Sequence, residues 1–273
     1  MTSLSTVGVV LAAMAVVALV EAVVPLRPRG AWNRAHLGPN LALTFITFGT
    51  NVAFNAALVA ALVWLEAHRI GLLNLRPLGW APALAVVVVV LDGSFYVAHV
   101  AMHRIPLLWR YHRVHHSDPA VDVTTTIRQH PGEGVIRYAF MAAFALPLGA
   151  SPAAFAVYRT WSALSGLLEH ANVRVPPCLD AWLSLVTTWP GVHKVHHSRA
   201  PHETNTNYGN ILSVFDRLCA TFTPPKDVRT IDYGLDGLDA AASQTTARLL
   251  ALPFRQVTSP SSTADALRPH PTA

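Results

Sequence analysis

The chain has 273 residues, of which 52% are hydrophobic and only 13% are charged, and its formal net charge is +5. Soluble domains carry about 25% charged residues, so this composition indicates a membrane protein and argues against a soluble domain. The basic residues are scattered without a consecutive run, which argues against nucleic-acid binding, and the two cysteines lack the C-x-x-C spacing of a thiolate metal site.

Three long apolar stretches come first along the chain. Leu4–Val24 is apolar except for Glu21, Leu41–Leu65 follows, and Trp80–His99 contains five consecutive valines. A helix needs about 20 residues to cross a bilayer, so these stretches predict three transmembrane helices. Asp92 lies inside the third stretch, where an acid either marks a functional site or makes a helix-packing hydrogen bond.

A fourth apolar region is interrupted near its middle. Gly134–Leu148 and Pro152–Leu168 are separated by the segment PLGASP at 147–152, and each half is short for a span. The break predicts a helical hairpin that dips into the membrane and returns, although one tilted crossing would also fit.

Basic residues predict the orientation in the membrane. Arginines follow the first span and none precedes it, so the positive-inside rule places the N-terminus outside and the loop 25–40 in the cytoplasm. Two further crossings return residues 100–133 to the cytoplasm, and a hairpin keeps residues 169–273 on that side. We also expect His36 and His68 to lie in loops at the membrane interface.

These elements predict an all-α fold, an integral membrane helical bundle with a cytoplasmic histidine-rich helical cap. Residues 1–80 form the N-terminal transmembrane helices and loops, and residues 81–225 form the histidine-rich domain. Residues 226–273 form a C-terminal segment that we expect to be largely disordered after about 256, because that tail is rich in Ser, Thr and Pro.

The histidines cluster after the third span. His99 and His103 are spaced i, i+4, which places both on one helix face. The segments RYHRVHHS at 110–117 and GVHKVHHS at 191–198 each carry H-x-V-H-H-S, whose three histidines share a face if the segment is helical. Imidazole binds zinc, copper, iron or nickel, and eight clustered histidines exceed the three or four ligands of one zinc site.

The histidine pattern therefore predicts two neighbouring metal ions. A zinc protease would need the H-E-x-x-H motif, and a soluble di-iron bundle would need Glu-x-x-His pairs; neither pattern occurs in the sequence. Iron is the preferred interpretation because it can activate dioxygen.

Further motifs accompany the histidines in order: HPGE at 130–133, LEHANVRVP at 168–176 and NYGNILSVFDRLCATF at 207–222. With them, residues 85–222 resemble the fatty acid hydroxylase/sterol desaturase superfamily of membrane non-haem di-iron enzymes. The resemblance implies ten metal ligands, of which the last two are the less central: His99, His103, His112, His115, His116, His193, His196, His197, His170 and His130.

Two departures from the family pattern concern ligands. Arg174 stands where some members have a further histidine, which leaves open whether His130 or a water fills that place. His202 has no counterpart in the family pattern, so we expect it to be peripheral.

Asn172, Asn207 and Asp216 are candidates to hold ligating imidazoles through hydrogen bonds, and the asparagines could instead cap helices. We expect no catalytic residue beyond the metal centre.

The resemblance implies an O2-dependent oxidoreductase that hydroxylates or desaturates a lipid such as a fatty acyl chain, a sterol or a carotenoid. Its cofactors would be two iron ions, with O2 as co-substrate and residues 81–225 as the catalytic domain. The sequence has no flavin, nicotinamide or haem fingerprint, so electrons would come from an external ferredoxin, cytochrome b5-like protein or reductase. The expected location is the inner or plasma membrane, with the active site on the cytoplasmic side.

A rival interpretation is a membrane metal-binding or metal-transport protein without oxygenase activity. Such a protein needs histidines or acids within its spans to form a pathway. Here the clustered histidines lie at or beyond the helix ends, and only Asp92 is clearly within a span.

Overall fold

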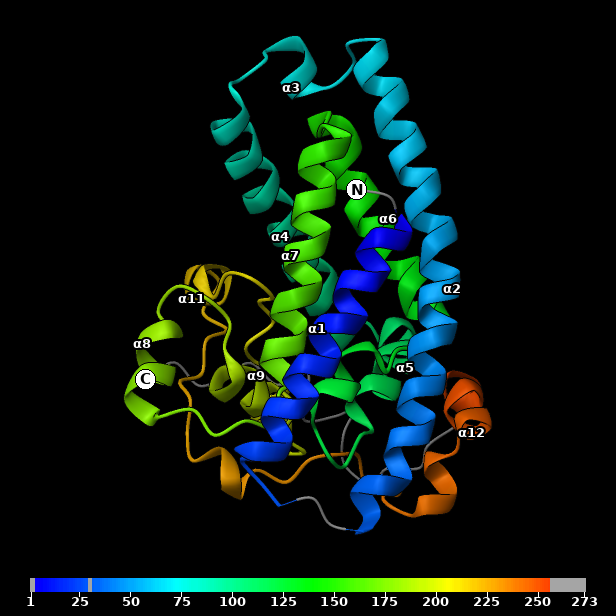
Figure 1. The fold of residues 1–273 in the computed structure, drawn as a ribbon, viewed down its shortest axis with the longest axis vertical. Helices are drawn as coiled ribbons and strands as arrows, with labels where there is room; N and C mark the ends of the chain where they lie inside the picture. The colour runs from blue at the N-terminus through cyan, green and yellow to red at the C-terminus, as the bar shows by residue number, and fades with distance from the viewer. Residues whose placement is uncertain (1–2, 29–30, 256–273) are drawn as a thin grey trace.

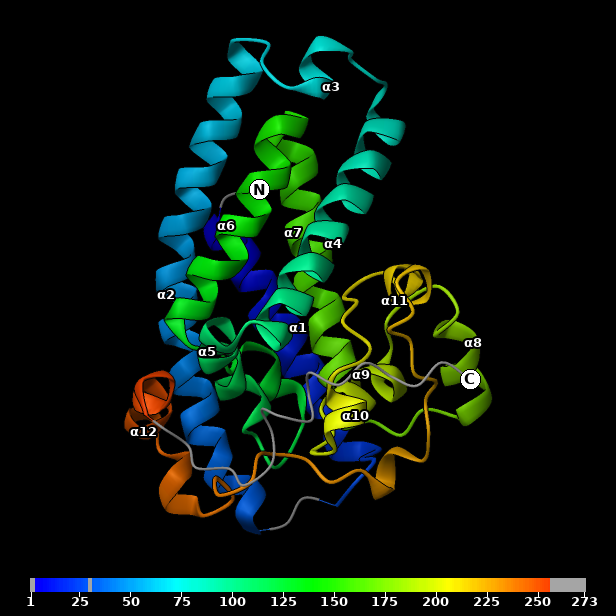
Figure 2. The ribbon, with the colours of Figure 1, turned by 180° about the vertical axis from the view of Figure 1, so that it is seen from behind.

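The computed structural model describes residues 3–28 and 31–255, which form helices, connecting loops and three isolated antiparallel bridges. Long helices run roughly along one axis, and short helices and loops gather around their lower end (Figures 1 and 2). Apart from these bridges, the described residues contain no β-strand. This confirms the predicted all-α fold class.

Three helices are long and apolar enough to cross a membrane: α1 (Ser3–Val23), α2 (Ala31–Ala67) and α4 (Trp80–Arg104). They confirm the three predicted spans. With 37 residues, α2 is about 55 Å long at 1.5 Å per residue, whereas a bilayer core is about 30 Å thick. Therefore α2 projects beyond the membrane, and the short α3 (Leu72–Leu75) joins its upper end to α4 (Figure 1).

The projecting end of α2 corrects the expectation of a loop at residues 25–40. Helix α2 already begins at Ala31 and continues through Pro39, so His36 lies on a helix and is only 2% exposed. Its ring is buried because the projecting end of α2 packs against the segment around Asp118 and Asp122. His68 lies in the turn that follows α2, outside the helix as expected, where it is exposed and stacks on Trp64.

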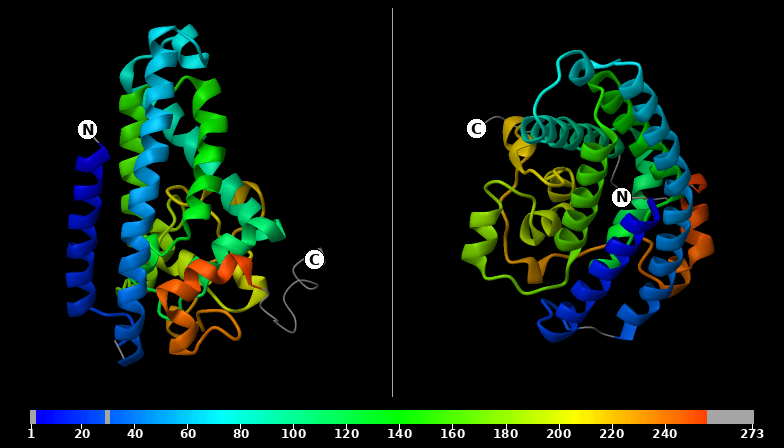
Figure 3. Two further views of the ribbon diagram at one scale, coloured as in Figure 1. Left: turned by 90° about the vertical axis from the view of Figure 1, so that its right-hand side faces the viewer. Right: turned by 45° about the horizontal axis from the view of Figure 1, so that its top comes forward.

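The fourth apolar region forms two helices, α6 (Pro131–Leu148) and α7 (Pro152–His170). Gly149 ends α6 with a φ of 67°, a left-handed conformation that favours glycine, and the Ser151 hydroxyl accepts a hydrogen bond from the Ala154 amide at 3.2 Å. The helical hairpin is therefore confirmed. Helix α6 packs on α2 and α4, and α7 packs on α1 and α4 (Figure 3).

Two acids in the first and third spans bind backbone amides of the cap. Asp92 accepts hydrogen bonds from the amides of Ile211 and Leu212 at 3.1 and 2.9 Å. Glu21 accepts hydrogen bonds from the amides of Val123 and Asn172 at 2.8 Å each. A buried acid is costly unless donors satisfy it. Of the two interpretations of Asp92, the structure therefore shows hydrogen bonding, to a loop rather than to a helix.

The cap is built from short helices, several of which begin at proline. They are α5 (Pro106–His116), η1 (Val123–Ile127), α8 (Pro177–Leu183), α9 (Pro190–His196), α10 (Pro201–Thr204) and α11 (Val214–Leu218). Proline suits the first helical turn because its missing N–H would be unpaired there anyway. These helices are held by the long helices on one side and by the C-terminal segment on the other.

The C-terminal segment wraps around α2 and α5. Its helices are η2 (Val228–Thr230), η3 (Ala241–Gln244), α12 (Thr246–Ala251) and η4 (Leu252–Phe254). Leu249 and Leu252 pack with Leu43 of α2 and Val114 of α5. Residues 226–255 are thus part of the folded cap, and the predicted disordered tail lies outside the described residues.

Candidate metal centre

Nine of the ten histidines proposed as ligands come together in one buried cluster. Two lie in the last two turns of α4, three on α5, one at the end of α7 and three on α9 and its C-cap: His99, His103, His112, His115, His116, His170, His193, His196 and His197. Four helices, α4, α5, α7 and α9, therefore meet where the cap joins the long helices.

The cluster divides into two groups, in each of which the ligand atoms lie within 4.8 Å of one another. The five-histidine group is His99, His103, His112, His116 and His196, and the four-histidine group is His115, His170, His193 and His197. Each H-x-V-H-H-S segment contributes to both groups, because adjacent histidines on a helix point about 100° apart.

Backbone carbonyls fix the protonation of several rings. The Nδ1 atoms of His99, His170 and His196 lie 2.9, 2.7 and 2.7 Å from the carbonyl oxygens of residues 208, 166 and 206. A carbonyl only accepts, so each Nδ1 carries the proton and each Nε2 keeps its lone pair. Ligating histidines in metalloproteins are oriented in this way. These carbonyls could not be predicted from the residue types, because every residue carries one.

The five-histidine group contains a contact that two imidazoles alone cannot satisfy. His99 Nε2 lies 3.1 Å from His112 Nε2. His112 Nδ1 lies 3.1 Å from a carboxylate oxygen of Glu133 and therefore also carries its proton. The two Nε2 lone pairs then face each other, an arrangement that repels unless a cation lies between them.

The four-histidine group also contains nitrogen atoms that cannot all form hydrogen bonds with one another. The Nε2 atoms of His170, His193 and His197 form a triangle with sides of 3.1, 3.1 and 3.2 Å. Each atom is either a donor or an acceptor, so at least one of the three pairs joins like with like. For comparison, nitrogen ligands about 2.0–2.1 Å from a tetrahedral zinc lie about 3.3–3.4 Å apart. Both donor sets therefore fit metal ions.

Burial keeps these imidazoles neutral. Removal from water, and next the neighbouring histidines, lowers the pKa of His115, His193 and His197 well below the ordinary value. Burial likewise lowers the pKa of His170 and of His196 to about 3. A neutral imidazole has one lone pair available for a metal, so the cluster is ready to bind cations at neutral pH.

Two carboxylates beside the histidines were not selected from the sequence. Glu133 Oε1 lies 2.8 Å from Arg137 Nε as well as beside His112, and Glu169 Oε2 lies 3.6 Å from His193 Nδ1. Burial would raise the pKa of Glu133, but His112 and Arg137 hold it below its usual value, whereas burial raises the pKa of Glu169. Glu133 stands in HPGE and Glu169 in LEHANVRVP, so each glutamate lies within three residues of a histidine of its motif.

His130 and His202 lie apart from the nine clustered histidines. His130 caps α6, since its Nδ1 accepts a hydrogen bond from the Gly132 amide at 2.9 Å, and its Nε2 lies 3.2 Å from the Leu250 carbonyl. The side chain of His202 is 74% exposed beside Glu203. Neither residue belongs to either histidine group.

The three residues predicted to hold ligating imidazoles, Asn172, Asn207 and Asp216, make hydrogen bonds to backbone atoms of the loops around the cluster. Asn172 exchanges hydrogen bonds with the backbone of Arg27, and Asn207 binds the carbonyls of residues 192 and 223. Asp216 accepts hydrogen bonds from the amides of Tyr208 and Gly209 at 2.8 and 2.7 Å. It thereby holds the loop whose Tyr208 carbonyl fixes His99.

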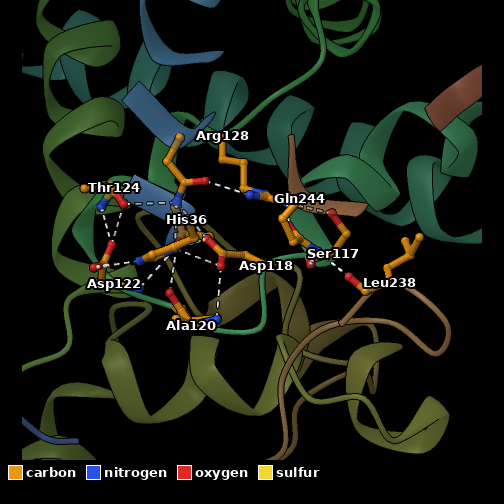
Figure 4. Close-up of polar contacts among 12 residues, drawn as sticks. His36, Ser117, Asp118, Ala120, Asp122, Thr124, Arg128, Leu238 and Gln244 are labelled. Carbon is orange, nitrogen blue, oxygen red and sulfur yellow. Dashed lines mark hydrogen bonds and ion pairs between the residues drawn. The ribbon is translucent and has the colours of Figure 1, made fainter. Parts of the chain in front are cut away.

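A buried polar network supports the end of α5 (Figure 4). The Arg128 guanidinium donates to the Val114 carbonyl, the Ser117 hydroxyl and the Asn40 side chain at 3.0, 2.9 and 2.7 Å. Asp118 lies 3.0 Å from His36 Nδ1 and accepts from the Asn40 amide at 2.8 Å. The network ties α5, which contributes to both histidine groups, to the projecting end of α2.

Two adjoining cavities connect the cluster with the long helices. The apolar chamber, of about 630 Å³, lies among α1, α2, α6 and α7, and the polar neck, of about 120 Å³, is lined by four of the clustered histidines. Those four are His99, His115, His170 and His193. The chamber and the neck share five lining residues: Phe48, Asn51, Tyr138, Arg159 and Ala163.

Comparisons with known proteins agree with this geometry. A family model described as fatty acid hydroxylase matches residues 84–221. An ornithine lipid hydroxylase of Rhizobium tropici is 31% identical over 242 residues, covering 84% of this chain and 70% of that protein. The alkylglycerol monooxygenases of Danio rerio and Homo sapiens are 32% and 27% identical; the matches cover 53% of this chain and only 31% of each relative. No solved structure matches the chain.

Proposed function

Because the chain belongs to the fatty acid hydroxylase family, we propose that it is an O2-dependent membrane hydroxylase that oxidises a C–H bond of a lipid at a pair of iron ions. The main support for this proposal is the pair of buried histidine groups. Their converging Nε2 atoms lie about 3 Å apart, an arrangement that suits a bound cation better than hydrogen bonds between the imidazoles. The names of the relatives, an ornithine lipid hydroxylase and alkylglycerol monooxygenases, support a lipid substrate.

In this proposal each histidine group holds one iron ion. A bound iron pair supplies the activation of dioxygen, for which the side chains have no equivalent. The hydroxylation balances as R–H + O2 + 2 e⁻ + 2 H⁺ → R–OH + H2O. The two electrons come from an external donor, either a ferredoxin, a cytochrome b5-like protein or a reductase. Desaturation would use the same inputs and release two waters.

The protein's own residues orient and shield the site. The carbonyls at residues 166, 206 and 208 hold three imidazoles with Nε2 turned inward. The Glu133 carboxylate lies 3.1 Å from His112 Nδ1, and Arg137 holds Glu133 in place. All nine clustered histidines are buried, which keeps bulk water away from a reactive oxidant.

The rival function of metal transport has less support. Transport would use the acids of the spans as a pathway, but Asp92 and Glu21 are engaged by backbone amides of the cap. We further propose that residues 81–225 are the catalytic domain and that the site faces the cytoplasm from the inner or plasma membrane, in agreement with the distribution of arginines.

The test uses the full-length protein purified in nanodiscs and loaded with Fe(II). Iron content is measured, and the protein is then incubated with ¹⁸O2, an electron donor and a total lipid extract. We expect two iron ions per chain and a lipid product that carries one ¹⁸O atom. Metal flux across liposomes, with no oxygen-dependent lipid product, would instead support the transporter.

A further inference from the structure

One arginine on the wall between the two cavities lacks an acidic partner. Arg159 of α7 lines both the chamber and the neck. Its Nη2 donates to the Tyr138 hydroxyl at 3.2 Å, but its buried Nε has no hydrogen-bond partner, and no ion pair of Arg159 occurs among the described residues. The nearby Arg137, in contrast, is paired with Glu133.

An unpaired cation at this position is costly. Arg159 is partly buried, so its guanidinium loses part of its hydration without gaining a counter-charge. The contact of the guanidinium with the Tyr138 ring, at 5.2 Å, offsets that loss only in part. The side-chain oxygen of Asn51, on the same shared wall, is also buried without a partner. An unpaired donor and an unpaired acceptor on one cavity wall indicate a polar ligand.

The two cavities differ in size and chemistry. The chamber is lined mainly by apolar side chains such as Val7, Val59 and Phe155, and its 630 Å³ lies within the roughly 300–1,000 Å³ of ligand pockets. The neck holds only about 120 Å³, about a fifth of the volume of the chamber. The chamber can take an acyl chain, and the neck can take only a short polar end.

We propose that Arg159 binds the anionic group, a carboxylate or a phosphate, of a lipid whose acyl chain fills the chamber, so that the polar end of the lipid points toward the histidines. This inference rests on the proposed function and adds the substrate's charge and direction. The oxidised carbon then lies at the polar end of the lipid, within a few atoms of the anionic group, and not at the far end of the chain.

The experiment measures binding without turnover. Iron-loaded full-length protein, without any electron donor, is titrated with stearic acid or with uncharged methyl stearate, and bound lipid is quantified by native mass spectrometry. We expect Arg159→Gln to weaken stearate binding roughly tenfold to a hundredfold, the range for one charge-assisted hydrogen bond, and to leave methyl stearate binding unchanged. Lysophosphatidic acid serves as the phosphate probe, and the tighter of the two anions identifies the source.

Three further variants separate the loss of the Arg159 charge from a general loss of positive charge and from misfolding. Arg248→Gln removes an exposed arginine of α12 and should change neither affinity. Ala156→Phe narrows the chamber and should weaken stearate binding but not octanoate binding. If Arg159→Gln loses its iron through misfolding, Arg159→Lys should keep the preference for the anion, and Ala156→Phe still tests the chamber.

An unchanged preference for stearate in folded Arg159→Gln, or equal binding of both chain lengths in Ala156→Phe, overturns the proposal. Because binding needs no turnover, a chain that proves inactive as a hydroxylase would contradict the proposed function alone. An active hydroxylase that oxidises the far end of the acyl chain would contradict this inference alone.

Discussion

The two histidine groups share α5 and α9 but face different surroundings. Three of the four histidines in the four-histidine group line the polar neck, whereas His99 alone represents the five-histidine group there. The four-histidine group is completed by His170 of α7, and the five-histidine group by His99 and His103 of α4. The four-histidine group therefore faces the polar neck, the proposed place of the substrate's polar end, more than the five-histidine group does.

The neighbouring carboxylates sharpen this contrast. Glu133, paired with Arg137, has a lowered pKa and is ionised beside the five-histidine group, whereas burial raises the pKa of Glu169 beside the four-histidine group. The five-histidine group thus has a fixed negative neighbour 3.1 Å from an imidazole nitrogen, and the four-histidine group has a looser contact of 3.6 Å. The two ions should therefore differ in affinity.

Adjacent histidines give the strongest test of the division into two groups. His115→Ala removes a ligand of the four-histidine group, and His116→Ala removes a ligand of the five-histidine group. Each variant should lose about one of the two proposed iron ions and at least about a hundredfold in turnover, more than the 10–100-fold that outer partners of a metal site cost. Iron content and Mössbauer spectra, which distinguish the two ions, provide the measurement. Retained turnover in His115→Ala would contradict the ligand assignment.

Loss of the buried Arg128 network, which supports the end of α5, should affect both histidine groups equally. Arg128→Met leaves the Val114 carbonyl, the Ser117 hydroxyl and the Asn40 side chain without their buried donor. Loss of one member of a buried charged network costs about 3 kcal/mol or more, so the unfolding midpoint in denaturant should fall clearly. Iron should be lost from both sites together. Selective loss of one ion would show that the network serves a single group.

Substitutions of Glu133 and Glu169 should have smaller effects that differ between the two histidine groups. Glu133→Gln keeps the size of the side chain but removes the charge beside His112 and Arg137, so turnover should fall about 10–100-fold. Glu169→Gln should cost less, because its contact with His193 is longer and burial already favours its neutral form. Turnover and iron affinity are compared for both variants. Equal losses of turnover in the two variants would show that the two histidine groups do not differ electrostatically.

Much of the fold followed from sequence periodicity, because lipid-facing helices and the PLGASP break leave clear local signals. The start of α2 did not, because Pro39 and its polar neighbours resemble a loop. The contacts that bury His36, with the carboxylates of Asp118 and Asp122, come from a segment about 80 residues later in the chain. The division of the histidines was equally hidden. It depends on how α5, α7 and α9 cross in space, and spacing within one helix cannot report that.

The peripheral histidines should give the smallest effects and set the limits of the centre. His202→Ala changes an exposed ring and should leave iron content and turnover unchanged. His130→Ala removes the cap of α6, which should cost about 1 kcal/mol of stability while both ions stay bound. The comparison needs iron content, turnover and a denaturant midpoint for each variant. Loss of iron in His130→Ala would add a tenth ligand to the nine that the structure gathers, because a ring that serves only as a cap has no reason to change metal binding.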